Sequence, residues 1–91
     1  MRQKNKTFFY NGKEHKVSLL TLKVFRKVVG KSQKDIGLET GLTREAVSNY
    51  ENGTTFRNFE LEKWYISHGL LSFNVDFNAL FKGVDEYGVY N

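Results

Sequence analysis

Apolar residues recur every three or four positions along much of the chain, which is the spacing of one face of an α-helix. The first such stripe predicts a helix from residue 19 to residue 29. Ser18 is placed to cap its start, and Gly30 is placed to end it, because glycine adopts the positive φ of a helix C-cap at little cost. The stripe consists of Leu22, Phe25, Val28 and Val29, and Lys23 and Lys27 point outward.

Residues 32–53 read as two short helices joined by a tight turn. The pattern predicts the first helix over residues 33–40 and the second from residue 44 to about residue 52. Both are bounded by residues that favour helix ends: Ser32 and Gly41 for the first, Thr43 and Gly53 for the second.

Apolar side chains can meet between these two helices, and the outer face of the second helix is then polar. A row of side chains that donate and accept hydrogen bonds is what readout of the DNA major groove requires. The apolar positions are Ile36, Leu42, Val47 and Tyr50, and the outward positions are Arg44, Glu45, Ser48 and Asn49.

The helical pattern resumes after a loop over residues 54–58 and predicts a helix from residue 59 to about residue 68, stopped by Gly69. A last short helix follows, with Asp76 as its N-cap, and residues 84–91 form an acidic, aromatic tail. Core positions in these two helices are Leu61, Trp64, Tyr65, His68, Phe77, Leu80 and Phe81.

Residues 7–17 carry a hairpin signal, since strand-favouring residues flank Asn11-Gly12, two residues that tolerate positive φ in a type I′ turn. Three roles remain open for this hairpin. It could lengthen a small core, form a dimer contact, or serve as a basic arm that touches DNA through Lys4, Lys6, Lys13 and Lys16.

Positive charge is concentrated in the N-terminal third of the chain. Residues 1–34 hold ten Lys or Arg and one acid, whereas residues 35–91 hold four Lys or Arg and nine acids, within a net charge of +4. Such an asymmetry favours a polyanionic partner on one face of the molecule.

The chain has no cysteine, and its two histidines, His15 and His68, are far apart, so neither a disulfide nor a metal site is expected. No segment approaches the roughly 20 apolar residues of a membrane span, and a cytoplasmic protein without cofactors is expected. Exposed acids such as Asp35 and Glu39 give no catalytic constellation, so an enzyme is not expected.

The sequence resembles the Cro/C1-type helix-turn-helix domains of phage repressors and their bacterial relatives over about residues 19–83. The resemblance implies a mainly α, lambda-repressor-like bundle of about five short helices, here preceded by a basic arm and hairpin over residues 1–18. It also implies a double-stranded DNA partner. A homodimer on DNA is expected from that function, because one domain of this size would bury too little DNA-contact area for high specificity. The matching positions are Arg26, Ser32, Gln33, Ile36, Gly41, Val47, Ser48 and the run Tyr50-Glu51-Asn52-Gly53.

The resemblance also implies roles for individual residues. Arg26 and Glu51 match a pair that forms a buried or half-buried structural salt bridge in related domains. The start of the helix at Gln33 matches a phosphate contact, and the free N–H groups of a helix start favour an anion on physical grounds as well. Base-reading positions are Thr43, Arg44, Glu45, Ser48 and Asn49, and phosphate positions are Lys31, Ser32, Gln33, Lys34, Asn52, Thr54, Thr55 and Arg57.

Two functions follow as alternatives. The first is a sequence-specific DNA-binding transcriptional regulator, a repressor of phage or mobile-element type. The second is an antitoxin or antirepressor-like module that keeps the fold but binds a protein partner through aromatic residues in excess of what a small core needs. These are Trp64, Tyr65, Phe73, Tyr87 and Tyr90.

Overall fold

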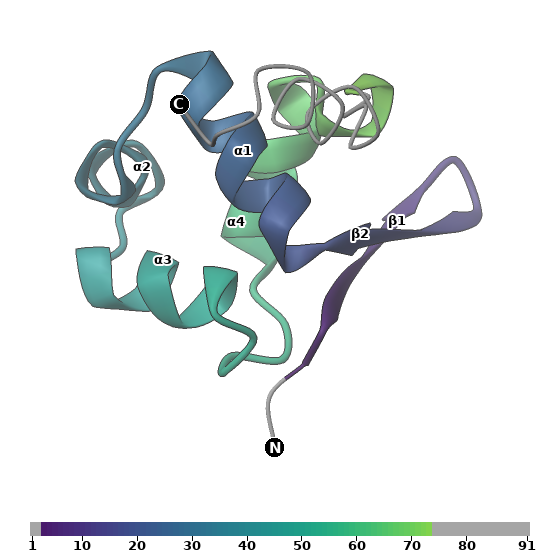
Figure 1. The fold of residues 1–91 in the computed structure, drawn as a ribbon, viewed down its shortest axis with the longest axis horizontal. Helices are drawn as coiled ribbons and strands as arrows, with labels where there is room; N and C mark the ends of the chain where they lie inside the picture. Colours follow the sequence, from purple (N-terminus) through teal and green to yellow (C-terminus); the bar gives the residue numbers. More distant parts are fainter. Residues whose placement is uncertain (1–2, 74–91) are drawn as a thin grey trace, which may run out of the picture.

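The computed structural model describes residues 3–73, which form a small helical bundle with an N-terminal β-hairpin (Figure 1). This confirms the mainly α fold with a hairpin. The last predicted helix, after Asp76, and the tail lie outside the described residues. The elements are β1 (Asn5–Tyr10), β2 (Lys13–Ser18), α1 (Leu19–Val29), α2 (Gln33–Thr40), α3 (Arg44–Glu51), α4 (Phe59–Ser67) and a 3₁₀ turn, η1 (Leu70–Ser72).

The hairpin has the predicted two-residue turn. Strands β1 and β2 pair antiparallel with Tyr10 opposite Lys13, and both turn residues have positive φ, 52° at Asn11 and 74° at Gly12. Positive φ at both central positions is the requirement of a type I′ turn, whose twist matches that of the flanking strands. The first strand begins at Asn5, two residues earlier than the sequence pattern predicts.

The predicted N-caps of α1, α2 and α3, which are Ser18, Ser32 and Thr43, are confirmed. Ser18 accepts a hydrogen bond from the Thr21 amide at 3.1 Å, and Gly30 adopts a left-handed φ of 85°. The start of α4 depends on a cap that the sequence pattern missed, because the Asn58 side chain accepts from the Leu61 amide at 3.1 Å. Local capping therefore fixes where the helices begin and end.

The core is aromatic at its centre. The Tyr65 ring lies 6.0 Å from Tyr50, 6.2 Å from Phe25 and 6.3 Å from Phe8, measured between ring centroids. Phe8 comes from β1, so the hairpin lengthens the core, which is one of the three roles open to it. The buried apolar residues are Phe8, Leu22, Phe25, Ile36, Val47, Tyr50, Leu61, Trp64, Tyr65 and Leu70.

Two predicted core positions are wrong. Val28 is 66 % exposed, because a helix turns about 100° per residue and this places Val28 roughly 120° away from Leu22, outside the inward arc. His68 is also exposed; it follows the last residue of α4, and its ring stacks on Trp64 with centroids 3.9 Å apart.

Among residues 3–73, no helix is long and apolar enough to cross a membrane.

Lys6 lies inside the fold, which corrects its expected place on a basic arm that touches DNA. Its side chain is 1 % exposed, and its ammonium group donates to the Gln3 side chain at 2.7 Å and to the Thr55 carbonyl. The same nitrogen lies 4.1 Å from the centroid of the Tyr50 ring, a cation–π contact. The cause is strand alternation, which puts Lys6 on the same inward face of β1 as Phe8.

Burial lowers the pKa of Lys6 from 10.5 to about 8, although nearby Glu62 opposes the shift. Between these two values the unfolded chain holds a proton that the folded chain has lost, so the free energy of unfolding should rise with pH above about 8. Urea unfolding at several pH values checks this against Lys6→Met, in which the rise should be absent. Tyrosines also ionise above pH 10, but they do so in both the wild type and Lys6→Met, so the difference between the two proteins reports on Lys6. If the free energy of unfolding changed with pH in the same way in both proteins, the prediction would be contradicted.

Candidate nucleic-acid interface

Helices α2 and α3 are joined by a turn that packs directly on α2. Gly41 has a left-handed φ of 75°, and the Leu42 amide donates to the Gly37 carbonyl at 2.8 Å. A Cβ atom at Gly37 would lie 2.8 Å from the Leu42 carbonyl oxygen, closer than real contacts allow. The absence of a side chain at Gly37 therefore sets how closely the start of α3 approaches α2.

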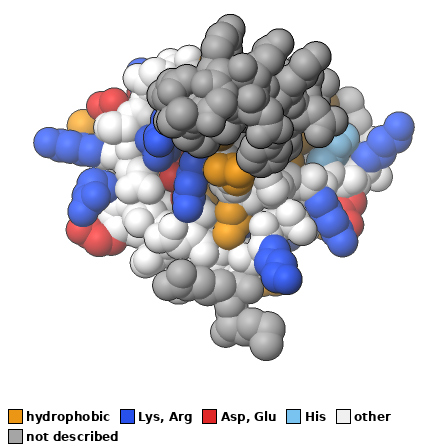
Figure 2. Space-filling view, viewed as in Figure 1, with side chains coloured by type: hydrophobic (Ala, Val, Ile, Leu, Met, Phe, Trp, Pro, Cys, Tyr) orange, Lys and Arg blue, Asp and Glu red, His pale blue; other side chains and the backbone are white. Residues whose placement is uncertain are grey.

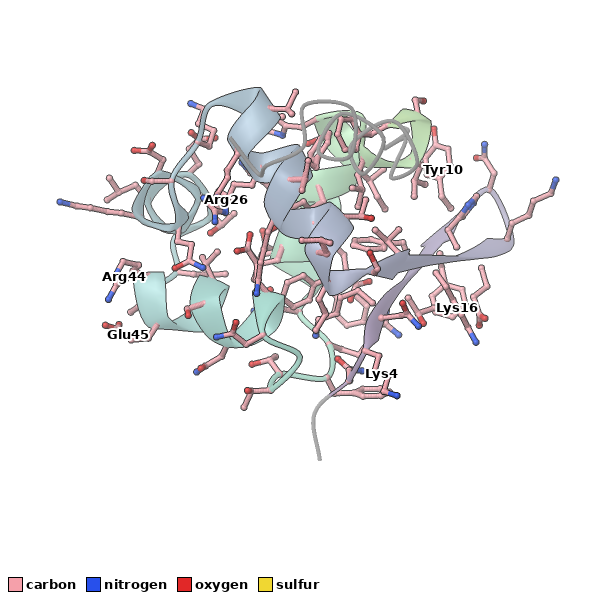
Figure 3. The ribbon with its side chains drawn as sticks, in the orientation of Figure 1. Lys4, Tyr10, Lys16, Arg26, Arg44 and Glu45 are labelled. Atoms are coloured by element: carbon pink, nitrogen blue, oxygen red, sulfur yellow. The ribbon has the colours of Figure 1, made fainter. Side chains whose placement is uncertain are left out.

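The outer face of α3 is polar and open to solvent. Arg44, Glu45 and Asn49 are exposed, and Ser48 is half-buried. Figure 3 shows Arg44 and Glu45 projecting from the first turn of α3, away from the body of the molecule. Within residues 3–73 neither residue forms a salt bridge, so both charged groups are free to meet a ligand. Thr43 caps this helix by accepting from the Ala46 amide at 3.1 Å.

A buried carboxylate holds the other end of α3. Glu51 is fully buried, and Arg26 of α1 donates to it through Nε at 2.8 Å, which confirms the predicted salt bridge. The Gln33 side chain donates to the other carboxylate oxygen at 3.0 Å, and the Tyr65 hydroxyl donates to the oxygen that Arg26 uses. Burial, and then the charge of Glu51, raise the pKa of Tyr65 far above its usual value. One side chain of α3 is thus tied to α1, α2 and α4.

The start of α2 carries a capping box. Ser32 accepts from the Asp35 amide at 3.0 Å, and Asp35 accepts from the Ser32 amide at 2.9 Å, which lowers the pKa of the Asp35 carboxyl. A serine with an acid three residues later is a recognisable sequence signal for this box. The box leaves the backbone amides of Gln33 and Lys34 as the open donors of the first turn. Because the Gln33 side chain serves Glu51, an anion would meet the backbone amide of Gln33.

Two predicted phosphate contacts are already paired with acids. The Lys31 ammonium nitrogen lies 2.7 Å from a carboxylate oxygen of Glu39. Arg57 donates two hydrogen bonds to the Glu62 carboxylate, at 2.7 Å and 2.9 Å. The Arg57 guanidinium also lies 4.8 Å from the centroid of the Phe59 ring. These cations would have to give up or share an existing partner in order to bind a phosphate.

The loop after α3 turns back along that helix. The amides of Thr54 and Thr55 both donate to the Asn49 carbonyl, at 2.9 Å and 3.2 Å, and Asn52 donates to the Ser48 hydroxyl at 3.3 Å. Thr54 is exposed, and Asn52 and Thr55 are half-buried. The structure therefore brings the predicted base-reading positions and the predicted phosphate positions of this loop onto neighbouring parts of one surface.

A contact that the sequence does not signal joins this loop to the N-terminal strand. The Gln3 amide donates to the Gly53 carbonyl at 3.0 Å, fifty positions away in the chain.

Figure 2 shows that basic side chains are spread around this view of the molecule and are not gathered into one patch. In this view, positive charge therefore does not mark out a single surface.

Comparison with protein families gives one match. Residues 22–64 match a family model described as helix-turn-helix. The match runs from α1 into α4 and contains α2, the turn and α3, but not the hairpin. No curated protein and no solved structure matches the chain.

Proposed function

Because residues 22–64 belong to the Cro/C1-type helix-turn-helix family of DNA-binding regulators, we propose that this chain is a sequence-specific repressor that reads the major groove with α3. The observation that carries the proposal is the exposed polar face of α3 on a helix whose far end is fixed by buried Glu51. A rigid helix presents its side chains to base edges at low cost in conformational entropy.

The side chains of this face suit base recognition. Arg44 can donate two hydrogen bonds to guanine, Asn49 can pair with adenine directly or through water, and Glu45 can accept from cytosine. Thr43 caps α3 beside Arg44. In this arrangement Thr43 and half-buried Ser48 would both lie at the edge of the groove. The freedom of Arg44 and Glu45 from intramolecular ion pairs in the described region supports direct contact with bases.

Backbone contacts would flank this reading face. The amides of Gln33 and Lys34 at the start of α2 form an anion site whose positive helix end favours phosphate. The loop after α3 supplies polar groups on the other side, and Lys31 and Arg57 would take part only by sharing their acidic partners. The proposed phosphate positions remain Lys31, Ser32, Gln33, Lys34, Asn52, Thr54, Thr55 and Arg57.

We infer further that the protein binds as a homodimer in the cytoplasm, with two half-sites about one helical turn, roughly 34 Å, apart. A single domain of this size contacts a short stretch of DNA, and a second copy supplies the specificity that one copy lacks. A dimer that covers a promoter represses by occlusion, the mode proposed here for a regulator of phage or mobile-element type. Sedimentation with and without the selected duplex tests the dimer, and a monomer under both conditions would rule it out.

Selection from a random pool of double-stranded DNA should enrich one motif with the wild-type protein. Arg44→Ala should then weaken binding to that motif by about 1–3 kcal/mol and relax the preference at one base pair, because a fork to guanine is lost. Lys63→Ala, at an exposed position of α4, is the control and should leave the preference unchanged. Failure to enrich any motif, with equal affinity for Arg44→Ala, would refute the proposal.

One observation favours a protein-binding function as the second candidate. Phe9, Phe56 and Phe59 are 54 %, 73 % and 67 % exposed, and the Arg57 guanidinium lies 5.4 Å from the centroid of the Phe9 ring and 4.8 Å from that of Phe59. This exposed aromatic cluster replaces the residues that the sequence suggested. Of those, Trp64 and Tyr65 are buried, Phe73 packs on Phe25, and Tyr87 and Tyr90 lie outside the described residues.

A partner chain of an antitoxin or antirepressor would reveal itself without DNA. Co-purification at a fixed stoichiometry from nuclease-treated lysate, lost on Phe56→Ser, would favour this second function. Phe56→Ser is suitable because its side chain is largely exposed and its loss should not disturb the core. Recovery of the chain alone would leave the DNA-binding proposal as the only one supported.

A further inference from the structure

The segment just before β1, residues 3 and 4, is docked against the end of the proposed reading helix. Besides the hydrogen bond from Gln3 to the Gly53 carbonyl, the Leu19 amide donates to the Lys4 carbonyl at 3.3 Å. The chain at residues 3 and 4 is therefore held on one side by the loop after α3 and on the other by the start of α1. These residues lie outside the matched helix-turn-helix segment, so this contact is a feature of the added hairpin.

The fit between the strand and the loop is close enough to require glycine. A Cβ atom at Gly53 would lie 2.5 Å from the Gln3 carbonyl oxygen and 3.0 Å from the Gln3 nitrogen. Gly53 also has a left-handed φ of 79° and is buried. Backbone lies directly on backbone here, so the segment leading into β1 is placed with little freedom relative to the C-terminal end of α3.

Lys6 fastens the same junction from inside the fold. Its buried ammonium bridges Gln3 and the Thr55 carbonyl, so it links the strand to the loop that also carries Asn52 and Thr54. The Lys6 ammonium is buried in these contacts and is not available to a ligand, whereas Lys4 is exposed. Figure 3 shows Lys4 at the end of β1 that lies beside the loop after α3, whereas Lys16 lies on the part of the hairpin away from α3.

We propose that residues 3–6 form a third DNA-backbone contact, in which the Lys4 ammonium binds a phosphate beyond the C-terminal end of α3. This inference rests on the proposed function. Because the backbone of the strand is already docked, only the Lys4 side chain must be ordered on binding. The loop polar groups at Asn52 and Thr54 and the Lys4 ammonium then follow one phosphate strand past the edge of the half-site.

Salt dependence is the direct measure of such a contact, because each neutralised phosphate releases bound counterions. Affinity for the duplex selected by the wild-type protein should be measured between 50 and 200 mM salt. Lys4→Gln should reduce the slope of log affinity against log salt by about 0.9, with the preferred sequence unchanged. Phosphate ethylation interference should lose one flanking position in the same variant.

Lys13→Gln is the matched control. Lys13 is an exposed lysine of the same hairpin, but it sits opposite Tyr10 at the turn, about 20 Å along the strand from Lys4 at roughly 3.3 Å per residue. Its slope should equal that of the wild-type protein. Thermal melts of both variants should match the wild type, since both side chains are exposed and neither forms a salt bridge within residues 3–73.

The possible outcomes separate the two proposals. If the wild-type protein enriches a motif and Lys4→Gln has an unchanged slope, the Lys4 contact is overturned and the proposed function survives. If Lys13→Gln lowers the slope as much as Lys4→Gln, the effect is general charge and the specific contact is again overturned. If the wild-type protein enriches no motif, the proposed function fails and the Lys4 contact fails with it.

Discussion

Glu51→Ala is expected to lower the free energy of unfolding by about 3–5 kcal/mol, the range found when one partner of a buried ion pair is removed. Arg26 is only 12 % exposed, so its guanidinium would stay buried without a counter-charge. The Tyr65 hydroxyl and the Gln33 amide would lose their acceptor at the same time. Unpartnered buried donors each add a desolvation cost, so the effect should lie well above that of an ordinary surface change.

Urea unfolding followed by circular dichroism measures this loss. Glu60→Ala is the matched control, because Glu60 forms an exposed salt bridge with Lys63 at 3.2 Å and such pairs contribute about 0–1 kcal/mol. A loss for Glu51→Ala no larger than that for Glu60→Ala would mean that the buried carboxylate does not hold α3. Where the variant is still folded, weaker DNA binding is also expected, since the C-terminal end of α3 would be less restrained.

Local sequence signals predicted helices α1 to α4 and the N-caps of the first three. Ser18, Ser32 and Thr43 cap the helices that their positions predict, and Asn11-Gly12 forms the predicted turn. These features depend on interactions between residues a few positions apart, which a single sequence displays directly. The Arg26–Glu51 pair is longer in range, but an arginine beside an apolar stripe demands an acid, and the family resemblance supplied its identity.

Contacts across the fold were not predictable in the same way. A lysine in a strand reads as exposed, and nothing near Lys6 in the sequence indicates that Thr55 and Tyr50 will surround it. Gly53 was expected to end a helix, but α3 ends at Glu51, and its close contact is with the distant Gln3. Gln33 was assigned to phosphate by analogy, and only the folded structure shows its side chain donating to Glu51.

Contacts between distant parts of the chain converge on the two ends of α3. Glu51 and Gly53 connect the C-terminal end of this helix to elements from most of the described chain. Gly37 controls its N-terminal end through contact with the turn. Helix placement is therefore set by long-range packing, while the residues proposed to read bases can be picked out from the sequence.

Gly37→Val tests the N-terminal end and is expected to lower the free energy of unfolding by about 2–3 kcal/mol, as overpacking of a close contact does. The new Cβ would meet the Leu42 oxygen at 2.8 Å and the Thr43 carbonyl carbon at 3.3 Å, and both are backbone atoms that cannot rotate away. For a domain of this size the loss corresponds to a fall in melting temperature of roughly 10–20 °C. Affinity for the selected duplex should fall as well, because α3 must shift relative to α2.

Two further variants separate the contact from helix propensity. Leu38→Val introduces the same β-branched residue at the next position of α2, where the side chain is 75 % exposed, and should cost only a few tenths of a kcal/mol. Gly37→Ala gains about 1 kcal/mol of helix propensity, and this gain offsets part of the cost of the close contact with Leu42. The loss of unfolding free energy should therefore be much smaller for Gly37→Ala than for Gly37→Val. Equal melting temperatures for Gly37→Val and Leu38→Val would show that the turn can yield without cost. In that case the spacing between α2 and α3 would have to be set by the Arg26–Glu51–Gln33 contacts alone.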